Sequence, residues 1–172
     1  RSTLFPYTTL FRSSTEIMAR GGESLEAFMR RCAEIEERLR RNQKAITRRV
    51  AMAVLSSVVQ GTPIDTGRAR SNWIVSISIR NPSFMPDAYV PGSHGSTTSQ
   101  NTQMAINQGT AVINGYNVNG NGIYIQNNVP YIQTLNRVGG RVIGPLFVQK
   151  AVKDGIANVR NLGGRIISTD IP

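Results

Sequence analysis

The sequence predicts an α+β fold: a long N-terminal helix, a small antiparallel sheet and short C-terminal helices. Residues 24–60 repeat apolar side chains at three- and four-residue spacing, residues 73–80 alternate apolar and polar, and glycines and prolines divide the rest into short segments. At 172 residues and 40% hydrophobic content, the chain suits one domain with a modest core. We assign that domain to residues 18–162 and a C-terminal tail to residues 163–172.

Residues 1–17 are interpreted as a non-native leader. Within them, residues 3–13 read as the in-frame translation of a common sequencing adapter, and Met18 would then be the true start. The alternative is a short β-prone arm, and the stretch lacks the continuous apolar core of a signal peptide. We therefore leave it out of the fold and the function.

The long helix is expected to begin at Ser24, whose hydroxyl can cap the first turn, with Glu26 placed favourably in that turn. About 36 residues at 1.5 Å each span roughly 54 Å, more than a domain of this size requires. Residues 30–49 are charged around a narrow apolar seam, whereas residues 50–59 are apolar almost all round. We expect the second half to be buried on the sheet and the first half to project toward a neighbouring subunit. The apolar positions are Leu25, Phe28, Cys32, Ile35, Leu39, Ile46, Val50 and Val54, interrupted by Asn42 and Gln43.

A helix stop and a compact turn follow. Gly61 is expected to take a left-handed cap conformation, and Pro63 cannot continue the helix. The Asp65 carboxylate is expected to accept backbone N–H groups of the turn, while Gly67 tolerates positive φ. If Asp65 caps the turn, its replacement by alanine should cost about 1–2 kcal/mol.

Two arginines, Arg68 and Arg70, are within reach of Asp65, so we expect an ion pair that fixes this corner. Trp73 is expected to anchor the core. A contact with a partner subunit is the alternative role, but the local backbone functions favour a structural one. The corner residues are Pro63, Asp65, Gly67, Arg68, Arg70 and Trp73.

The strand that starts at Trp73 is expected to place Val75, Ile77 and Ile79 on one buried face and to end at residues 81–82. A long loop over residues 81–100, a weak helix over 101–113 and a second strand at residues 123–126 come next. A short helix starting at Pro130 is expected to carry Tyr131 and Leu135 on one face. In the final helix, residues 145–161, the apolar face is expected to be Val148, Val152, Ile156 and Val159.

The net charge of +10, from 20 basic and 10 acidic residues, raises nucleic acid as a partner. Nine basic and five acidic residues lie within residues 20–49, whereas residues 81–136 carry one charged side chain, Asp87. Pairs such as Glu34–Arg38 and Glu37–Arg41 favour a solvated helix face over a nucleic-acid surface. Contact with an acidic neighbouring subunit is a third reading. The cations concerned are Arg30, Arg31, Arg38, Arg40, Arg41, Lys44, Arg48 and Arg49.

Enzyme signatures are weak, and no cofactor or metal is expected. His94, the one histidine, lies in a glycine- and serine-rich loop without a carboxylate placed to orient it. Cys32, the one cysteine, falls on the apolar seam and is expected to be a small buried hydrophobe. No run of about 20 apolar residues is present, so no membrane partner is expected.

Three segments resemble phage tail-completion and neck proteins, a group that includes minor tail proteins of the Z type and related head–tail joining proteins. Residues 62–73, T-P-I-D-T-G-R-A-R-S-N-W, resemble the family stretch P-(V/I)-D-T-G-x-(A/L)-x-x-x-W. Residues 122–136, G-I-Y-I-Q-N-N-V-P-Y-I-Q-T-L-N, are similar to its strand followed by N-N-x-P-Y-x-x-x-L. Residues 145–152, P-L-F-V-Q-K-A-V, match its short C-terminal helix. The three segments occur in the family's order.

The resemblance implies a virion structural protein that acts by assembly in the neck or tail, after synthesis in the host cytoplasm. It implies a homo-oligomeric ring, commonly of six subunits, between the head connector or adaptor and the tail tube or terminator proteins, with at most a passing contact with DNA. The alternative from the residues is a nucleic-acid-binding protein that uses the basic helix 30–49. The candidate subunit-interface residues are Arg30, Arg31, Arg38, Arg41, Tyr131 and Leu135.

Overall fold

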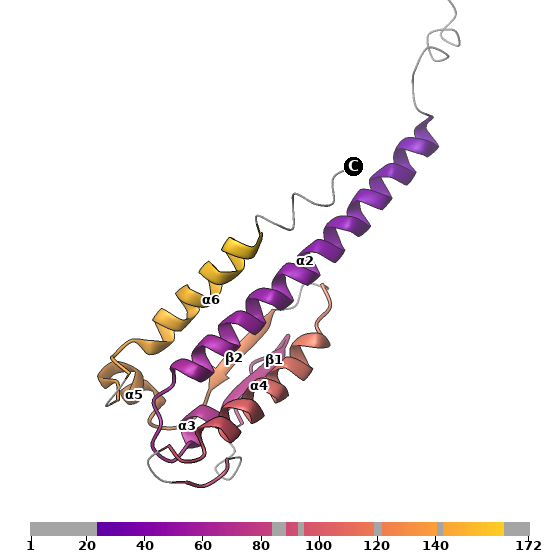
Figure 1. Cartoon of the computed structure of the whole chain (residues 1–172). Helices are drawn as coiled ribbons and strands as arrows, with labels where there is room; N and C mark the ends of the chain where they lie inside the picture. The colour runs from indigo at the N-terminus through magenta and orange to yellow at the C-terminus, as the bar shows by residue number, and fades with distance from the viewer. Residues whose placement is uncertain (1–23, 84–88, 93–94, 119–121, 141–142, 164–172) are drawn as a thin grey trace, which may run out of the picture. The chain divides into compact units, whose positions relative to one another are not determined.

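The computed structural model describes residues 24–83, 89–92, 95–118, 122–140 and 143–163 (Figure 1). They form helices and a two-stranded sheet, and the predicted α+β class is confirmed. The elements are α2 (Leu25–Gly61), α3 (Arg68–Ser71), β1 (Trp73–Ile77), α4 (Thr98–Asn114), β2 (Ile123–Asn127), α5 (Ile132–Val138) and α6 (Phe147–Gly163). The chain divides into two compact units, residues 1–40 and residues 41–172. Residues 1–17, interpreted as a non-native leader, and residues 164–172 of the expected tail lie outside the described residues. Gly163, the first residue of that expected tail, is the last residue of α6.

Helix α2 starts where the sequence predicts. The Ser24 Oγ accepts the Ala27 N–H at 3.2 Å, and the Ser24 carbonyl accepts the Phe28 N–H at 2.9 Å. In the first unit every residue from 28 to 40 is exposed to solvent.

Strands β1 and β2 pair antiparallel, with Val75 opposite Ile125 and Trp73 opposite Asn127. The strand ends earlier than predicted, at Ile77, because Ser78 takes a positive φ of 71°. The Ser78 N–H donates to the Gly122 carbonyl at 2.9 Å, and the reversed backbone leaves Ile79 exposed, not on the buried face. A positive φ at a serine is not visible in an alternating pattern.

Within the second unit, residues 41–61 of α2 and helix α4 cover one face of the sheet (Figure 1). A Cβ added to Gly109 of α4 would lie 2.4 Å from Leu55 Cδ2 and 2.8 Å from Val75 Cγ2. The glycine therefore allows α4 to sit against α2 and β1 at once.

Helix α6 packs along α2 through small residues. A Cβ added to Gly155 would lie 2.9 Å from the Val54 Cα and N atoms, and Phe147 and Ala151 are buried beside it. The buried face is thus Phe147, Ala151 and Gly155. The predicted face is confirmed in part: Val148 and Val152 are partly buried and pack against the core, whereas Val159 is half-buried and Ile156 is exposed. The spacing of large apolar residues does not reveal the buried face of a helix that approaches its neighbour through glycine and alanine.

Candidate functional site

The chain leaves α2 through a corner, residues 61–73, that is tied together by Thr62. This side chain is fully buried. Its hydroxyl donates to the Val58 carbonyl at 2.6 Å and accepts the Trp73 indole N–H at 2.7 Å. One hydroxyl therefore satisfies a helix-end carbonyl and fixes the buried tryptophan.

Arg70, from α3, caps the C-terminal end of α2. Its Nη2 donates to the carbonyls of Gln60 at 2.8 Å and Thr62 at 2.7 Å, and its Nη1 donates to Thr102 Oγ1 of α4 at 3.0 Å. The cation thus meets orphan carbonyls at the negative end of the helix dipole. Burial lowers the pKa of Arg70, although a guanidinium stays charged at any ordinary pH.

This arrangement corrects the expected left-handed cap at Gly61. Among the described glycines, positive φ occurs at Gly67, Gly95 and Gly139, whereas Gly61 is the last residue of α2. With Thr62 and Arg70 binding the terminal carbonyls, the helix needs no reversal at that position.

Gly67 does take a positive φ, 90°, and it lies directly over Asn101 of α4. The Asn101 side chain is fully buried. Its Oδ1 accepts the Val90 N–H at 2.8 Å, while its Nδ2 donates to the carbonyls of Val90 at 3.0 Å and Thr97 at 3.1 Å. Asn101 thus holds the chain at Val90 to the start of α4, a role that its place in a weakly periodic polar stretch did not suggest.

The expected ion pair of Asp65 with Arg68 or Arg70 is wrong. Among the described residues the Asp65 side chain is exposed and makes no hydrogen bond or ion pair; only its carbonyl is used, by the Gly95 N–H at 3.1 Å. Arg70 turns to the helix-end carbonyls, and the Arg68 guanidinium lies over the Tyr89 ring at 5.1 Å. Both cations therefore have better partners than a solvated carboxylate.

Replacing Asp65 with alanine should consequently change the free energy of unfolding by less than about 0.5 kcal/mol. Urea unfolding of the two proteins, followed by tryptophan fluorescence at Trp73, measures this. Asp65→Asn is the matched control, because it removes the charge and keeps the shape. A loss above about 1 kcal/mol in Asp65→Ala alone would restore the capping role.

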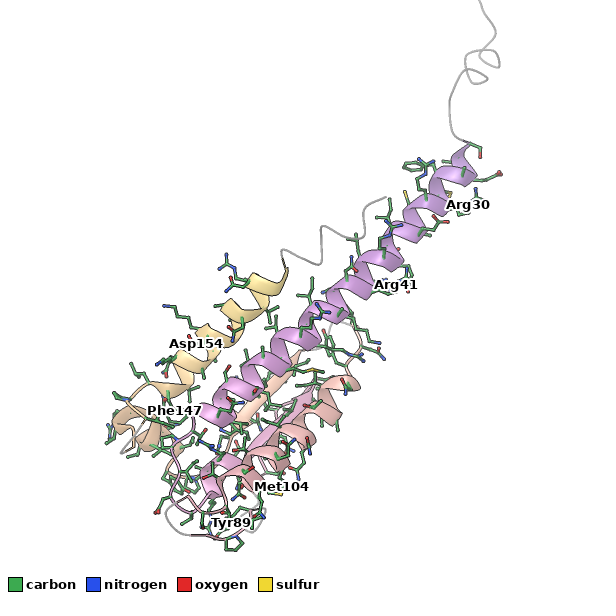
Figure 2. The ribbon with its side chains drawn as sticks, viewed as in Figure 1. Arg30, Arg41, Tyr89, Met104, Phe147 and Asp154 are labelled. Atoms are coloured by element: carbon green, nitrogen blue, oxygen red, sulfur yellow. The ribbon has the colours of Figure 1, made fainter. Side chains whose placement is uncertain are left out.

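An open cleft of about 900 Å³ lies against the corner. Its walls combine residues 63–69 with Tyr131 and Leu135, two candidate interface residues. Tyr89, which is labelled in Figure 2, also lines the cleft. Burial raises the pKa of Tyr131, and the nearby Arg68 offsets part of that rise. A cation, two phenols and an apolar leucine on one concave surface suit contact with another polypeptide.

The arginines on the N-terminal half of α2 are exposed at all four candidate positions, Arg30, Arg31, Arg38 and Arg41. The pairs Glu34–Arg38 and Glu37–Arg41 do not form. Across the part of the chain that the structure describes, one ion pair on this helix joins instead the Arg40 Nη2 and Glu36 Oε1 atoms at 2.7 Å.

Two of the basic residues have structural partners that the sequence did not reveal. The Lys44 Nζ donates to Asn117 Oδ1 at 2.6 Å. The Arg48 Nη2 donates to the carbonyls of Asn114 and Tyr116, the latter at 3.0 Å. These cations stabilise the C-terminal end of α4, where the helix dipole is negative. Because they are bound within the chain, we no longer count them in the candidate nucleic-acid surface.

Within the described ranges, no group of three histidine, cysteine, aspartate or glutamate side chains is placed to hold a metal ion. Cys32 is exposed, which corrects the expectation of a buried thiol. His94 lies outside the described residues. No helix in these ranges is long and apolar enough to cross a membrane. Comparison with known proteins gave no match to a family model, a curated protein or a solved structure.

Proposed function

We propose that this chain is a structural subunit of a phage virion, a tail-completion or neck protein that joins the head connector to the tail by forming a ring. The observation that carries the proposal is the cleft. The segments 62–73 and 122–136, which separately resemble the neck family, supply residues to the same concave surface. Because both segments contribute to one surface, a common role in binding a partner explains them better than two unrelated structural roles.

The exposure of apolar side chains supports an assembly role. Leu25 is 73% exposed, Phe28 56% and Leu39 62%, all on a helix that is otherwise strongly charged. Clustered apolar residues on a protein surface mark contacts with another molecule. The partners in this proposal are further copies of the chain, the head connector or adaptor, and the tail tube or terminator proteins.

Sedimentation of the chain at physiological salt, with and without duplex DNA, tests the proposal. Rings of one defined mass that form without DNA are the expected result, and their mass gives the subunit number. A subunit that assembles only on its partner would sediment as a monomer and form rings when purified connector is added. A monomer indifferent to both connector and DNA would contradict the proposal.

Replacing Arg30, Arg31, Arg38 and Arg41 by glutamine should reduce incorporation into particles several-fold while leaving the melting temperature within about 2 °C, because all four side chains are exposed. The comparison is complementation of a phage that lacks the subunit. Removing the same number of charges from exposed positions elsewhere, Arg80, Lys150, Lys153 and Arg160, is the matched control. Equal incorporation of the two variants would show that the helix face is merely solvated.

A nucleic-acid-binding protein remains the second candidate, favoured by the exposed arginines of α2. Its signature is stoichiometric co-sedimentation with duplex DNA that falls steeply with salt, since each phosphate neutralised contributes a slope of about −0.9 in log affinity against log salt. With Lys44 and Arg48 bound to the end of α4, that surface is smaller than the sequence suggests.

A further inference from the structure

The N-terminal half of α2 repeats a seven-residue pattern. Starting from Leu25, the steps between seam positions are alternately three and four residues. The seam positions are Leu25, Phe28, Cys32, Ile35, Leu39, Asn42 and Ile46. Five of the seven are large apolar residues, and all seven are exposed. A strict seven-residue repeat is the pattern by which helices supercoil around one another, whereas one face packed on a globular core needs only the 3.6-residue period.

The seam is not the face that the second unit uses for its own core. Ile46 is 51% exposed, whereas Leu55, nine residues further along the same helix, is fully buried. Nine residues at 3.6 per turn place two side chains about 180° apart. The core of the second unit therefore leaves this side of the helix uncovered, apart from an open hollow that Ile46 lines with Ile123 and Ile125.

We propose that the seam pairs with the same seam of a second copy, in a parallel, in-register coiled coil over residues 25–46. The pattern and its charges carry the inference independently of the proposed function. With Leu25 at heptad position a, Arg31 takes position g and Glu36 takes the next position e.

The flanking charges favour parallel over antiparallel pairing. In a parallel pair, position g of one helix faces position e of the following heptad on the other, so Arg31 lies beside Glu36 of the other copy on both sides of the seam. The Glu36 Oε1 atom already binds Arg40 of its own helix, so Arg31 would share this carboxylate with Arg40. In an antiparallel pair centred on the seam, g positions face each other and Arg31 meets Arg38. Like charges at close range oppose that arrangement.

Asn42 favours the in-register alignment. It occupies position d, where a parallel pair without stagger places it beside the Asn42 of the other copy and lets the two amides bond to each other. A shift by one heptad would place the amide opposite Ile35 or Arg49 of the other copy instead. Opposite Ile35 the amide would have no hydrogen-bond partner, which is unfavourable in an apolar seam. The pairing extends over about 33 Å.

Cys32, the one cysteine of the chain, occupies position a and reports the geometry directly. Parallel in-register helices bring Cys32 beside Cys32 of the other copy, within the 4.4–6.8 Å Cα separation that a disulfide spans. Antiparallel helices pair position a with position d, so they place Cys32 opposite a residue of position d and not beside a second Cys32. We expect the full chain, treated with diamide, to yield a covalent dimer on a non-reducing gel that a reductant reverses.

The control moves the thiol off the seam. In Cys32→Ser/Ala33→Cys the thiol stays exposed on the same turn but takes position b, so cross-linking should fall at least ten-fold. Ile35→Lys should abolish cross-linking at Cys32 while the single chain stays folded, because Ile35 is exposed in the single chain. Arg31→Glu should weaken cross-linking, and Arg31→Glu/Glu36→Arg should restore it.

No dimer at Cys32, equal yields from positions 32 and 33, or a dimer that survives Ile35→Lys would each overturn the inference. Its failure is distinguishable from failure of the proposed function. Rings in sedimentation without the Cys32 cross-link contradict only the coiled coil, whereas a cross-linked dimer that never forms rings, alone or on the connector, supports the coiled coil and contradicts the neck assignment.

Discussion

Replacing Arg70 with methionine is expected to lower the free energy of unfolding by about 3 kcal/mol, among the largest effects of any single change at the corner. The guanidinium donates to two carbonyls at the end of α2 and to Thr102 of α4. Hydrogen bonds from a charged donor contribute about 1.5–3 kcal/mol each, and methionine keeps the aliphatic volume while leaving the carbonyls without that donor. Urea unfolding measures the change.

Two variants separate the geometry of the guanidinium from its charge. Arg70→Lys keeps the cation but lacks the planar fork that reaches two carbonyls and a hydroxyl at once, so it should recover less than half of the loss. Arg68→Met removes a neighbouring cation that makes only a ring contact, and it should cost less than about 1 kcal/mol. Equal losses from the Arg68 and Arg70 variants would show that Arg70 does not cap α2.

The elements of the fold follow from local signals, which is why the sequence predicts them well. The long helix was expected over residues 24–60 and occupies Leu25–Gly61, and both strands begin where the alternation begins. Capping by Ser24 depends on residues within one turn, and the structure contains it. Helix α3, of four residues, is too short to leave a periodic pattern and was not predicted.

The interactions that connect these elements could not be predicted in the same way. Arg70 was expected to bind the nearest carboxylate in sequence, Asp65, but the turn brings it to backbone carbonyls, which carry no sequence signature. Lys44 and Arg48 bind residues more than 60 positions away. The cleft joins Tyr131 to the corner for the same reason. Partner choice depends on which chemically equivalent group lies closest in space.

Replacing Gly67 with alanine is expected to lower the free energy of unfolding by about 2–4 kcal/mol, from two separate causes. A φ of 90° is strained for any residue with a Cβ, at a cost of about 1–2 kcal/mol. The added Cβ would also lie 2.3 Å from the Nδ2 atom of Asn101, and overpacking a buried site costs about 1–3 kcal/mol. Thermal and urea unfolding measure the sum, with Gly144→Ala as the control because nothing lies within 4 Å of a Cβ added there.

A double-mutant cycle with Asn101→Ala separates the two causes. Asn101→Ala alone should be destabilising, since it removes the bonds that hold Val90. In the Gly67→Ala background it also removes the colliding amide, so the double variant should be more stable than the sum of the single losses predicts, by at least about 1 kcal/mol. Strict additivity would mean that the two residues do not touch in solution. Gly67 lines the cleft, and the buried Asn101 side chain lies next to it. Strict additivity would therefore also mean that Asn101 does not hold this wall of the cleft in place, which would argue against a preformed docking surface.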